Sequence, residues 1–394
     1  MREVAQSANA NTGAGRSSPR RSFSLFNTKA GSIDITFLIL VLLLLSIGLV
    51  MLFSASFAFA YYNRGDSFAF ISSQIVFAVA GVILMLMIST INYRILYKLS
   101  LPVYVATLVM LVAVFAFPPI NGARRWIHLG FTNFQPSEIA KFAVVILFAW
   151  VIIRNFEKMN TFRYGILPFG ILLMPIVVLM LLQPHLSGTI LILGIGATMM
   201  VVGGSSLRWF GFMAAVALGI LLALVLFTDF ISYAEYRLIY WRDPFADPQG
   251  RGFQTIQSLL AIGSGGMMGV GIGNSMQKYL YLPEPQNDFI FAIVAEELGF
   301  VGATLIILLF ALLVWRGFVI GMRCKDKFGS LVAIGLTTQV GLQAILNIMV
   351  VTNTVPNTGI SLPFFSYGGT ALIMLLCQMG VVLAISRQTP MEKN

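Results

Sequence analysis

The sequence predicts an all-α integral membrane protein with about ten transmembrane helices and a large extracytoplasmic loop between helices 7 and 8. Of 394 residues, 58% are hydrophobic and 10% are charged, whereas a soluble domain carries about 25% charged residues. Apolar runs of membrane-spanning length recur along most of the chain, and the longest polar interruption follows the seventh run. No folded globule could hide this much apolar surface from water, so lipid must be the solvent.

The apolar runs place the individual spans. A spanning helix needs about 20 predominantly apolar residues. The runs lie near 35–58, 68–91, 100–117, 137–153, 165–183, 187–203, 209–228, 288–315, 330–351 and 369–386. The fourth and sixth runs are the shortest, so fusing or losing one of them would lower the count.

The two ends of the chain are polar. Residues 1–32 are rich in Ser, Asn, Ala, Gly and Arg, which excludes a secretory signal and predicts a disordered basic cytoplasmic arm. Residues 33–387 form the membrane domain, and residues 388–394 form a short cytoplasmic tail. The net charge of +10 is explained by basic cytoplasmic loops and anionic lipid head groups, so we expect no nucleic-acid partner.

Lysine and arginine in the loops predict the orientation. With the N-terminus in the cytoplasm, 17 of the 25 basic residues fall inside and 7 fall outside, and Lys141 lies within a span. Both termini are therefore expected in the cytoplasm, with Cys324 inside and residues 229–287 outside. Two cysteines and two histidines form no disulfide framework or zinc motif.

The outer loop at 229–287 is too apolar and aromatic to be disordered, and a loop of this length is usually functional if it is ordered. Its first part predicts a short helix at the level of the lipid head groups, formed around Tyr233, Tyr236, Arg237, Tyr240, Trp241 and Arg242. The glycines of 263–273 lack the pattern of a nucleotide loop. They predict a tight re-entrant segment in which backbones approach closely.

Four polar segments fall on the outer side under this orientation, at 121–141, 183–189, 250–288 and 358–369. Polar groups near a bilayer are costly and require a reason. Asp288 stands where the outer loop enters the eighth span, and a boundary of low dielectric raises the proton affinity of a carboxylate. A general base for a sugar hydroxyl needs that property. The alternative is a helix N-cap formed by Asn287 or Asp288, and the sequence leaves both open.

Glu296 and Glu297 lie deeper in the same apolar run. One of them could extend a polar cleft. The alternative, which we favour, is a buried carboxylate that pairs with Lys141 or hydrogen-bonds between helices.

Five cations on or near the outer side oppose the positive-inside tendency and therefore suggest an anionic ligand. The planar fork of arginine suits phosphate. For any single cation, contact with ordinary lipid phosphates is the alternative. We assign the whole set to ligand binding: Arg124, Arg125, Lys141, Arg251 and Lys278. Of these, we expect Arg124 and Lys278 to lie near water when the site is empty.

Several motifs resemble the SEDS family, whose members include FtsW, RodA and SpoVE. They are Asn-Gly-Ala-Arg-Arg-Trp at 121–126, Gln-Pro-Ser-Glu-Ile-Ala-Lys at 135–141, Gln-Ser-Leu-Leu-Ala-Ile-Gly-Ser-Gly-Gly at 257–266, Tyr-Leu-Pro-Glu-Pro-Gln-Asn-Asp-Phe-Ile-Phe at 281–291 with Glu-Glu-Leu-Gly at 296–299, and Leu-Pro-Phe-Phe-Ser-Tyr-Gly-Gly at 362–369. The Tyr-Leu-Pro-Glu-Pro segment and the basic arm look more like FtsW or SpoVE than RodA.

The resemblance implies a peptidoglycan glycosyltransferase with a ten-helix fold. Its substrate would be lipid II, a disaccharide pentapeptide on undecaprenyl diphosphate. The family's catalytic aspartate falls on Asp288, and Trp126 matches a tryptophan important in the family. We also assign Glu284 and Ser366 to substrate binding. The implied partners are a class B penicillin-binding protein transpeptidase and divisome or sporulation proteins. The implied location is the bacterial cytoplasmic (inner) membrane, for septal or spore wall synthesis.

The chain departs from the family at one motif. Members commonly read Gln-Pro-Asp-Leu-Gly-Thr after the fifth span, whereas this chain has Gln-Pro-His-Leu-Ser-Gly-Thr at 183–189. His185 thus replaces an acidic residue, and this shifts weight onto Asp288 as the acid–base group.

The implied reaction converts an α-linked donor into a β-linked product, which one inverting displacement explains. Asp288 would deprotonate the acceptor 4-hydroxyl. Cations would stabilise the leaving diphosphate, with a divalent cation (Mg²⁺ or Mn²⁺) left open and its ligands unknown. The rival functions are a lipid II flippase or other transporter, and a non-catalytic scaffold. The outer position of the polar groups disfavours a carrier, because carriers bind near the midplane.

Overall fold

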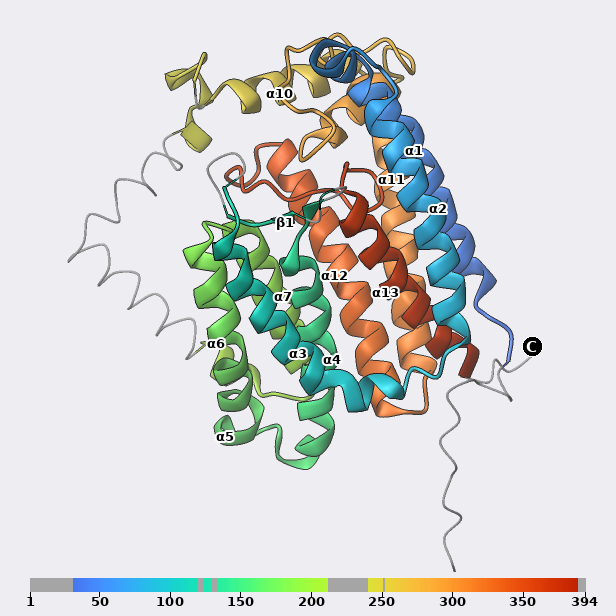
Figure 1. Cartoon of the computed structure of the whole chain (residues 1–394), viewed down its shortest axis with the longest axis vertical. Helices are drawn as coiled ribbons and strands as arrows, with labels where there is room; N and C mark the ends of the chain where they lie inside the picture. The colour runs from blue at the N-terminus through green and yellow to red at the C-terminus, as the bar shows by residue number, and fades with distance from the viewer. Residues whose placement is uncertain are drawn as a thin grey trace, which may run out of the picture.

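The computed structural model describes residues 31–119, 124–128, 130, 133–211, 240–250 and 252–388. In this part of the chain, eight helices are long and apolar enough to cross a membrane, and they run side by side as a bundle (Figure 1). They are formed by α1 (Ile35–Arg64), α2 (Ala69–Thr90), α3 (Ile95–Ala113) extended to Ala116, α4 (Pro136–Arg154), α6 (Leu167–Leu182) together with the turn that starts at Phe162, α11 (Ile290–Arg323), α12 (Lys327–Val351) and α13 (Gly369–Gln388). The predicted class, an all-α multi-spanning membrane protein, is confirmed.

Shorter elements complete the described bundle. They are the apolar helix α7 (Leu186–Val202), the one-turn helix α5 (Phe162–Gly165) before α6, and the 3₁₀ turns η1 (Val114–Ala116), η2 (Phe156–Lys158) and η3 (Pro244–Ala246). Nine of the ten predicted spans correspond to described helices. The predicted seventh span, 209–228, lies outside the described residues except for 209–211. Residues 1–30 of the predicted arm and residues 389–394 of the predicted tail also lie outside them.

Helix ends follow local chemistry. The carboxylate of Asp34 accepts a hydrogen bond of 2.9 Å from the backbone N–H of Phe37 and so caps α1. The same carboxylate pairs with Arg316 of α11, whose Nη2 lies 2.8 Å from Oδ2. Helix α4 opens with Pro136, which suits the first turn because its missing N–H is not needed there.

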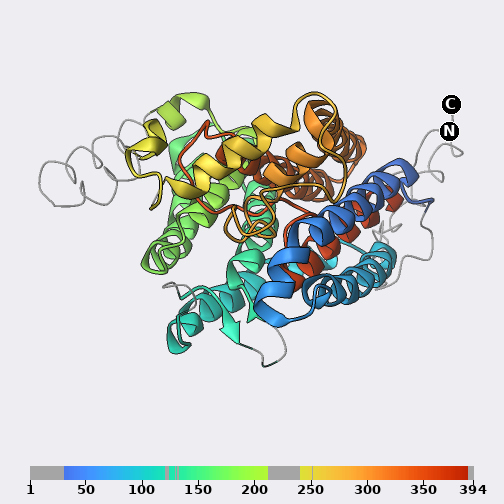
Figure 2. The same cartoon turned by 90° about the horizontal axis from the view of Figure 1, so that it is seen from above.

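The helices differ in how far they are enclosed. Helix α13 packs along α2, and α12 contacts α11, α4 and α7, so α12 lies inside the bundle (Figure 2). Helices α4 and α12 are buried over most of their length, whereas α2 and α3 expose most of theirs. Exposed apolar faces are expected where lipid replaces water as the solvent.

One end of the bundle carries the irregular structure. Helix α10 (Phe253–Gly265) lies across the end at which α11 begins (Figure 1). Strand β1 (Ile127–His128) pairs antiparallel with β2 (Asn133–Phe134), with Ile127 opposite Phe134, and β2 leads into α4. Of the helix predicted around 233–242, residues 240–242 are described and are helical. There the Trp241 indole donates to the carbonyl of Asn353 at 3.0 Å.

The glycine-rich segment after α10 packs directly on the backbone of α11, as its composition predicts. Helix α11 is broken at Gly299, which has φ 68°. Near the break, two backbone carbonyls of α11 accept hydrogen bonds from the glycine-rich segment. The N–H of Val270 donates to the Glu296 carbonyl at 3.0 Å, and the N–H of Gly271 donates to the Glu297 carbonyl at 3.1 Å. A Cβ at Gly269 would collide with the Glu297 carbonyl, so glycine is required for this approach.

The two ends of the described chain meet at one end of the bundle. The N–H of Gly31 donates to the carbonyl of Arg387 at 2.9 Å. The N–H of Asp34 donates to the Ser386 hydroxyl at 3.1 Å. Both ends of the described chain therefore lie on the same side of the bundle, and the identity of that side remains a prediction.

Candidate active site

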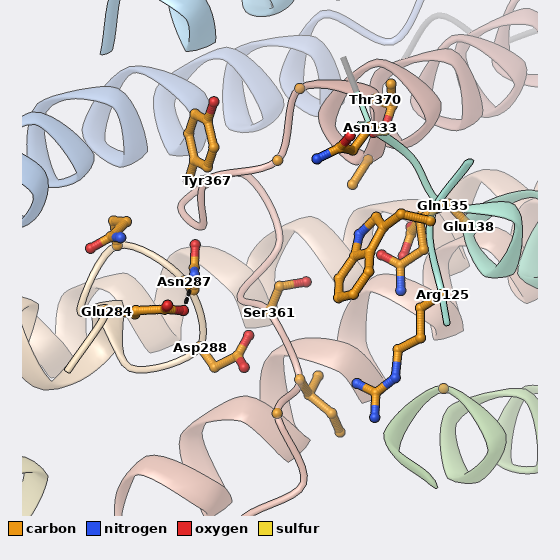
Figure 3. A pocket seen from close by; sticks show the side chains of 18 of the residues that line it. Arg125, Asn133, Gln135, Glu138, Glu284, Asn287, Asp288, Ser361, Tyr367 and Thr370 are labelled. Carbon is orange, nitrogen blue, oxygen red and sulfur yellow. Dashed lines mark hydrogen bonds between the residues drawn. The ribbon is translucent and has the colours of Figure 1, made fainter. Parts of the chain in front are cut away.

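A cavity of about 790 Å³ opens among the loops and helix ends near the start of α11. All four polar segments singled out in the sequence contribute to its wall. Its polar and aromatic lining includes Arg64, Arg125, Trp126, Asn133, Gln135, Glu138, Lys141, His185, Glu284, Asp288, Gln343, Ser361 and Tyr367. Asp288 and Ser361 point from one wall toward the opposite wall, which carries Arg125 and Gln135 (Figure 3).

Asp288 is held through its backbone, which leaves its carboxylate directed at the cavity. Asn347 of α12 donates to the Asp288 carbonyl at 2.7 Å, and the Ser366 hydroxyl donates to the Asn287 carbonyl at 2.6 Å. The N-cap of α11 is Phe289, and no side chain caps this helix. The N-cap alternative for Asp288 and Asn287 is therefore wrong.

Protein atoms enclose the Asp288 carboxyl on most sides. The pKa of this carboxyl is raised to about 6, chiefly by burial and in smaller part by the Glu284 carboxylate, whereas Arg125 acts in the opposite direction. Such a group is mostly ionised at neutral pH and is still basic enough to take a proton.

Glu284 and Ser366 shape the loop that carries Asp288. The Glu284 carboxylate accepts from the Asn287 amide at 2.9 Å, and Glu284 has a φ of 45°. A non-glycine residue in this region is strained and often marks a functional site. Ser366 lines a small neighbouring cavity, not the large one, and the N–H of Leu362 donates to its hydroxyl at 2.7 Å.

Among the described residues, the cations that reach the cavity are Arg64, Arg125 and Lys141. Arg125 donates from Nε to the Gln183 carbonyl at 3.4 Å and from Nη2 to the Pro184 carbonyl. Lys141 Nζ lies 2.7 Å from Glu138 Oε2 and 3.0 Å from Gln343 Oε1. These contacts fix the positions of the positive charges of Arg125 and Lys141 in the cavity wall.

The other predicted cations lie elsewhere. Arg124 is exposed and donates to the Phe115 carbonyl at 3.1 Å, away from the cavity lining. Lys278 is 3% exposed and pairs with Glu297 at 3.0 Å, so the expectation that it lies near water is wrong. Arg251 lies outside the described residues.

The interpretation of Glu296 and Glu297 as buried, hydrogen-bonded carboxylates is confirmed. Each is 1% exposed, and each accepts hydrogen bonds from the neighbouring loop. The suggested pairing with Lys141 is wrong. The basic partner of Glu297 is Lys278, and Lys141 pairs with Glu138.

His185 occupies the cavity wall where the family's acidic residue was expected. Its pKa is lowered to about 3, chiefly by burial and in smaller part by the nearby Arg125 and Lys141. Its ring sits against Gly188, where any Cβ would collide with it. The side chain is therefore neutral at pH 7 and cannot supply the negative charge of a carboxylate.

Sequence reasoning missed Arg64, Ser361 and Gln343 as lining residues. Gln343 lies inside the ninth predicted span, where Gln339, Gln343 and Asn347 recur every four residues in an apolar run, and that pattern was a usable signal. Ser361 belongs to a polar segment that was singled out, but nothing in its spacing distinguished it from its neighbours.

The metal question can be tested on the donors present. The described residues contain no group of three or more His, Cys, Asp or Glu side chains placed to hold a metal ion. Asp288 and Glu284 nonetheless line the same cavity. One or two carboxylates, completed by substrate phosphates and water, are the usual donors for Mg²⁺, so the residues present fit that mode of binding.

Fold and cavity together define a multi-spanning membrane protein with a basic carboxylate opposite fixed cations. A family model described as "Cell cycle protein", for FtsW, RodA and SpoVE, matches residues 35–391, and the chain belongs to this family. It is 42% identical over 364 residues to Stage V sporulation protein E of Bacillus subtilis, covering 91% of this chain and 98% of that protein. It is 38% identical over 358 residues to a probable peptidoglycan glycosyltransferase FtsW of Geobacter sulfurreducens, covering 90% and 95%.

Solved structures share the fold. A chain from a structure described as "Structural coordination of polymerization and crosslinking by a peptidoglycan synthase complex" has a TM-score of 0.75 and 30% identity, covering 91% of this chain and 99% of that chain. The rod shape determining protein RodA of Thermus thermophilus has a TM-score of 0.66 and 28% identity, covering 91% and 98%.

Proposed function

We propose that the protein is a peptidoglycan glycosyltransferase that joins lipid II disaccharide units into glycan strands by inverting glycosyl transfer. One observation carries the proposal: an enclosed aspartate, Asp288, with a pKa near 6 faces Arg125 across a polar cavity. The names of the relatives and the shared fold point to the same chemistry.

In this reaction Asp288 takes the proton of the acceptor 4-hydroxyl while that oxygen attacks the anomeric carbon of the donor. The bond between that carbon and the diphosphate oxygen breaks, and the electron pair leaves with the diphosphate. Attack opposite the leaving group turns an α-linked donor into a β-linked product. Arg125 and Lys141 stabilise the charge that develops on the diphosphate. The proton on Asp288 then passes to water in the open cavity.

The remaining lining residues serve binding. Trp126 presents a flat aromatic surface beside Arg125 in the cavity wall, which suits the face of a sugar ring. Glu284 and Ser366 act by holding the loop around Asp288. Arg124 and Arg251 stay in the proposal only as contacts for the outer parts of the substrate.

A divalent cation fits this scheme without a dedicated protein cage. Glu284 would hold Mg²⁺ or Mn²⁺ together with substrate phosphates and water, which leaves the Asp288 carboxylate to take the proton. Bound there, the ion would supply positive charge for the leaving diphosphate.

The relatives support a proposed biological setting. We place the protein in the bacterial inner membrane with both termini in the cytoplasm, working beside a class B penicillin-binding protein that crosslinks the new glycan. A role in septal or spore wall synthesis, with divisome or sporulation proteins as further partners, fits the likeness to FtsW and SpoVE.

The transporter alternative loses its main support. It rested on the intramembrane carboxylates Glu296 and Glu297, and both are bonded to a neighbouring loop, away from the cavity lining. A carrier would be expected to present such groups to its pathway.

Lipid II polymerisation by the purified full chain in detergent tests the proposal, because a flippase has no bilayer to work across there. The wild type should form glycan strands, and Asp288→Asn should lower the rate by about 10²-fold or more, the scale of acid–base catalysis. Asparagine keeps the size and one hydrogen-bonding oxygen, so folding should be retained. Near-normal polymerisation by Asp288→Asn would remove Asp288 as the base.

A further inference from the structure

A second group of charged side chains lies away from the cavity, where α1, α11 and residues 275–278 meet. Glu296, Glu297 and Lys278 are each at most 3% exposed, and none of them lines the cavity. Two carboxylates and one ammonium group buried together are costly unless each is paired or hydrogen-bonded. Their contacts therefore indicate what the group holds in place.

Both carboxylates bind the same short segment. Lys278 Nζ lies 3.0 Å from Glu297 Oε1 and 3.2 Å from the Ser54 hydroxyl. The Ser54 hydroxyl of α1 donates to the Glu297 carboxylate, 2.6 Å from Oε1. The Glu296 carboxylate accepts from the N–H of Met276 at 2.9 Å and from the Ser275 hydroxyl. The cluster thus fastens residues 275–278 to α11 and, through Ser54, to α1.

The fastened segment is the near end of the loop that carries Asp288. Its far end is held separately, because Tyr367 donates its N–H to the Gln286 carbonyl at 2.9 Å and Asn347 bonds Asp288. Residues 279–281 between the two anchors are exposed. The near end therefore depends on the buried cluster and on the glycine segment for its position.

We propose that Lys278 is a positioning residue, whose ion pair with Glu297 fixes the loop carrying Asp288 while Ser54 couples that loop to α1. Its catalytic consequence rests on the proposed function. Without the ammonium group, Glu297 would stand buried with no opposite charge, and residues 275–278 would move toward water to solvate it. Asp288 would then lose the enclosure in which it works.

The first test compares Lys278→Met with Lys158→Met, which removes an exposed lysine at the far end of the bundle. Lys278→Met should lower the kcat of lipid II polymerisation by about tenfold or more, the scale of a misplaced catalytic group, with KM changed by less than about twofold. The acidic limb of its pH–rate profile should move to lower pH, because water reaching Asp288 favours the ionised carboxylate. Lys158→Met should match the wild type.

The second test is rescue. Lys278→Met/Glu297→Gln removes both charges and should recover a large part of the rate lost in Lys278→Met, and Lys278→Arg should stay close to wild type in its pH profile. A lysine that binds the substrate diphosphate directly would behave otherwise. Its loss would raise KM, and neutralising Glu297 would restore nothing. That result would overturn the proposal.

Hydrogen–deuterium exchange of residues 275–288 gives a readout that does not need activity. Exchange should be faster in Lys278→Met and near wild type in the double variant. If Lys278→Met does not fold, Ser54→Ala, which removes one hydroxyl, should show the same changes in milder form. Unchanged exchange would refute the positioning role, whereas a wild type that cannot polymerise lipid II would refute the proposed function alone.

Discussion

Gly359 stands directly against the carboxylate of Asp288. A Cβ at position 359 would lie 3.1 Å from Asp288 Oδ2, and the residue has a φ of 69°. Two independent features therefore disfavour a side chain here, since the backbone is in the left-handed region and a Cβ would crowd the carboxylate.

Gly359→Ala should lower both stability and activity. The left-handed backbone alone costs about 1–2 kcal/mol for a residue with a Cβ, and contact with Asp288 should displace the carboxylate and lower polymerisation by about tenfold or more. Gly204→Ala is the control, because Gly204 has φ 92° and a Cβ at that position would meet nothing within 4 Å. Equal loss of activity in both variants would show that the contact with Asp288 does not matter.

The pH–rate profile should respond in opposite directions to the two charged neighbours of Asp288. The active form is the ionised carboxylate, so the rate should fall as the pH drops through about 6. Glu284→Gln removes a negative charge that raises the pKa, so the acidic limb should move to lower pH. Arg125→Gln removes a positive charge that lowers the pKa, so the limb should move to higher pH.

Arg124→Gln is the matched control for this experiment. Arg124 is the chain neighbour of Arg125 but is bonded to the Phe115 carbonyl outside the cavity lining. Its loss should leave the acidic limb in place. A limb that moves in the same direction in Glu284→Gln and Arg125→Gln would show that a group other than Asp288 sets it.

Thermal stability should also depend on the ionisation of the Asp288 carboxyl. The folded state holds the proton of Asp288 up to a pH of about 6, whereas the unfolded chain releases it near the ordinary value of 3.8. The raised pKa therefore stabilises the folded state fully at a pH below 3.8, the pKa in the unfolded chain. That contribution is lost as the pH rises through about 6. Asp288→Asn cannot ionise, so its Tm relative to wild type should increase between about pH 4 and pH 7. A constant Tm difference across this range would contradict a raised pKa.

Orientation can be tested with engineered cysteines in a chain lacking Cys324 and Cys377. Gln249 lies in the loop before α10, and Met322 lies near the end of α11; both are exposed. A membrane-impermeant thiol reagent should label Gln249→Cys on intact cells and Met322→Cys only after permeabilisation. The reverse pattern would invert the orientation.

The sequence was sufficient for the helices because the bilayer leaves few choices. A long apolar run has to satisfy its backbone internally and therefore forms a helix, which is why even the short run near 137–153 appears as α4 (Pro136–Arg154). The sequence also predicted that Asp288, Arg125 and Lys141 lie on or near the same side of the membrane. In the structure all three line one cavity.

Neighbouring cations could not be told apart from the sequence. Arg124 and Arg125 have the same chemistry, and the direction of the backbone before β1 decides that only Arg125 lines the cavity. The partner of Lys278 was equally hidden, because the break at Gly299 brings the glycine segment against α11.

The contact between Gly31 and Arg387 makes the described chain nearly a closed ring. Gly31, its first residue, and Arg387, its last but one, exchange hydrogen bonds in both directions, at 2.9 and 3.2 Å. A short linker could therefore join them, and the chain could be reopened in the turn at 324–326, between α11 and α12. Such a circular permutant would keep every helix–helix contact while changing the order in which helices enter the membrane. It would reveal whether the final bundle depends on the order of insertion or on its packing alone.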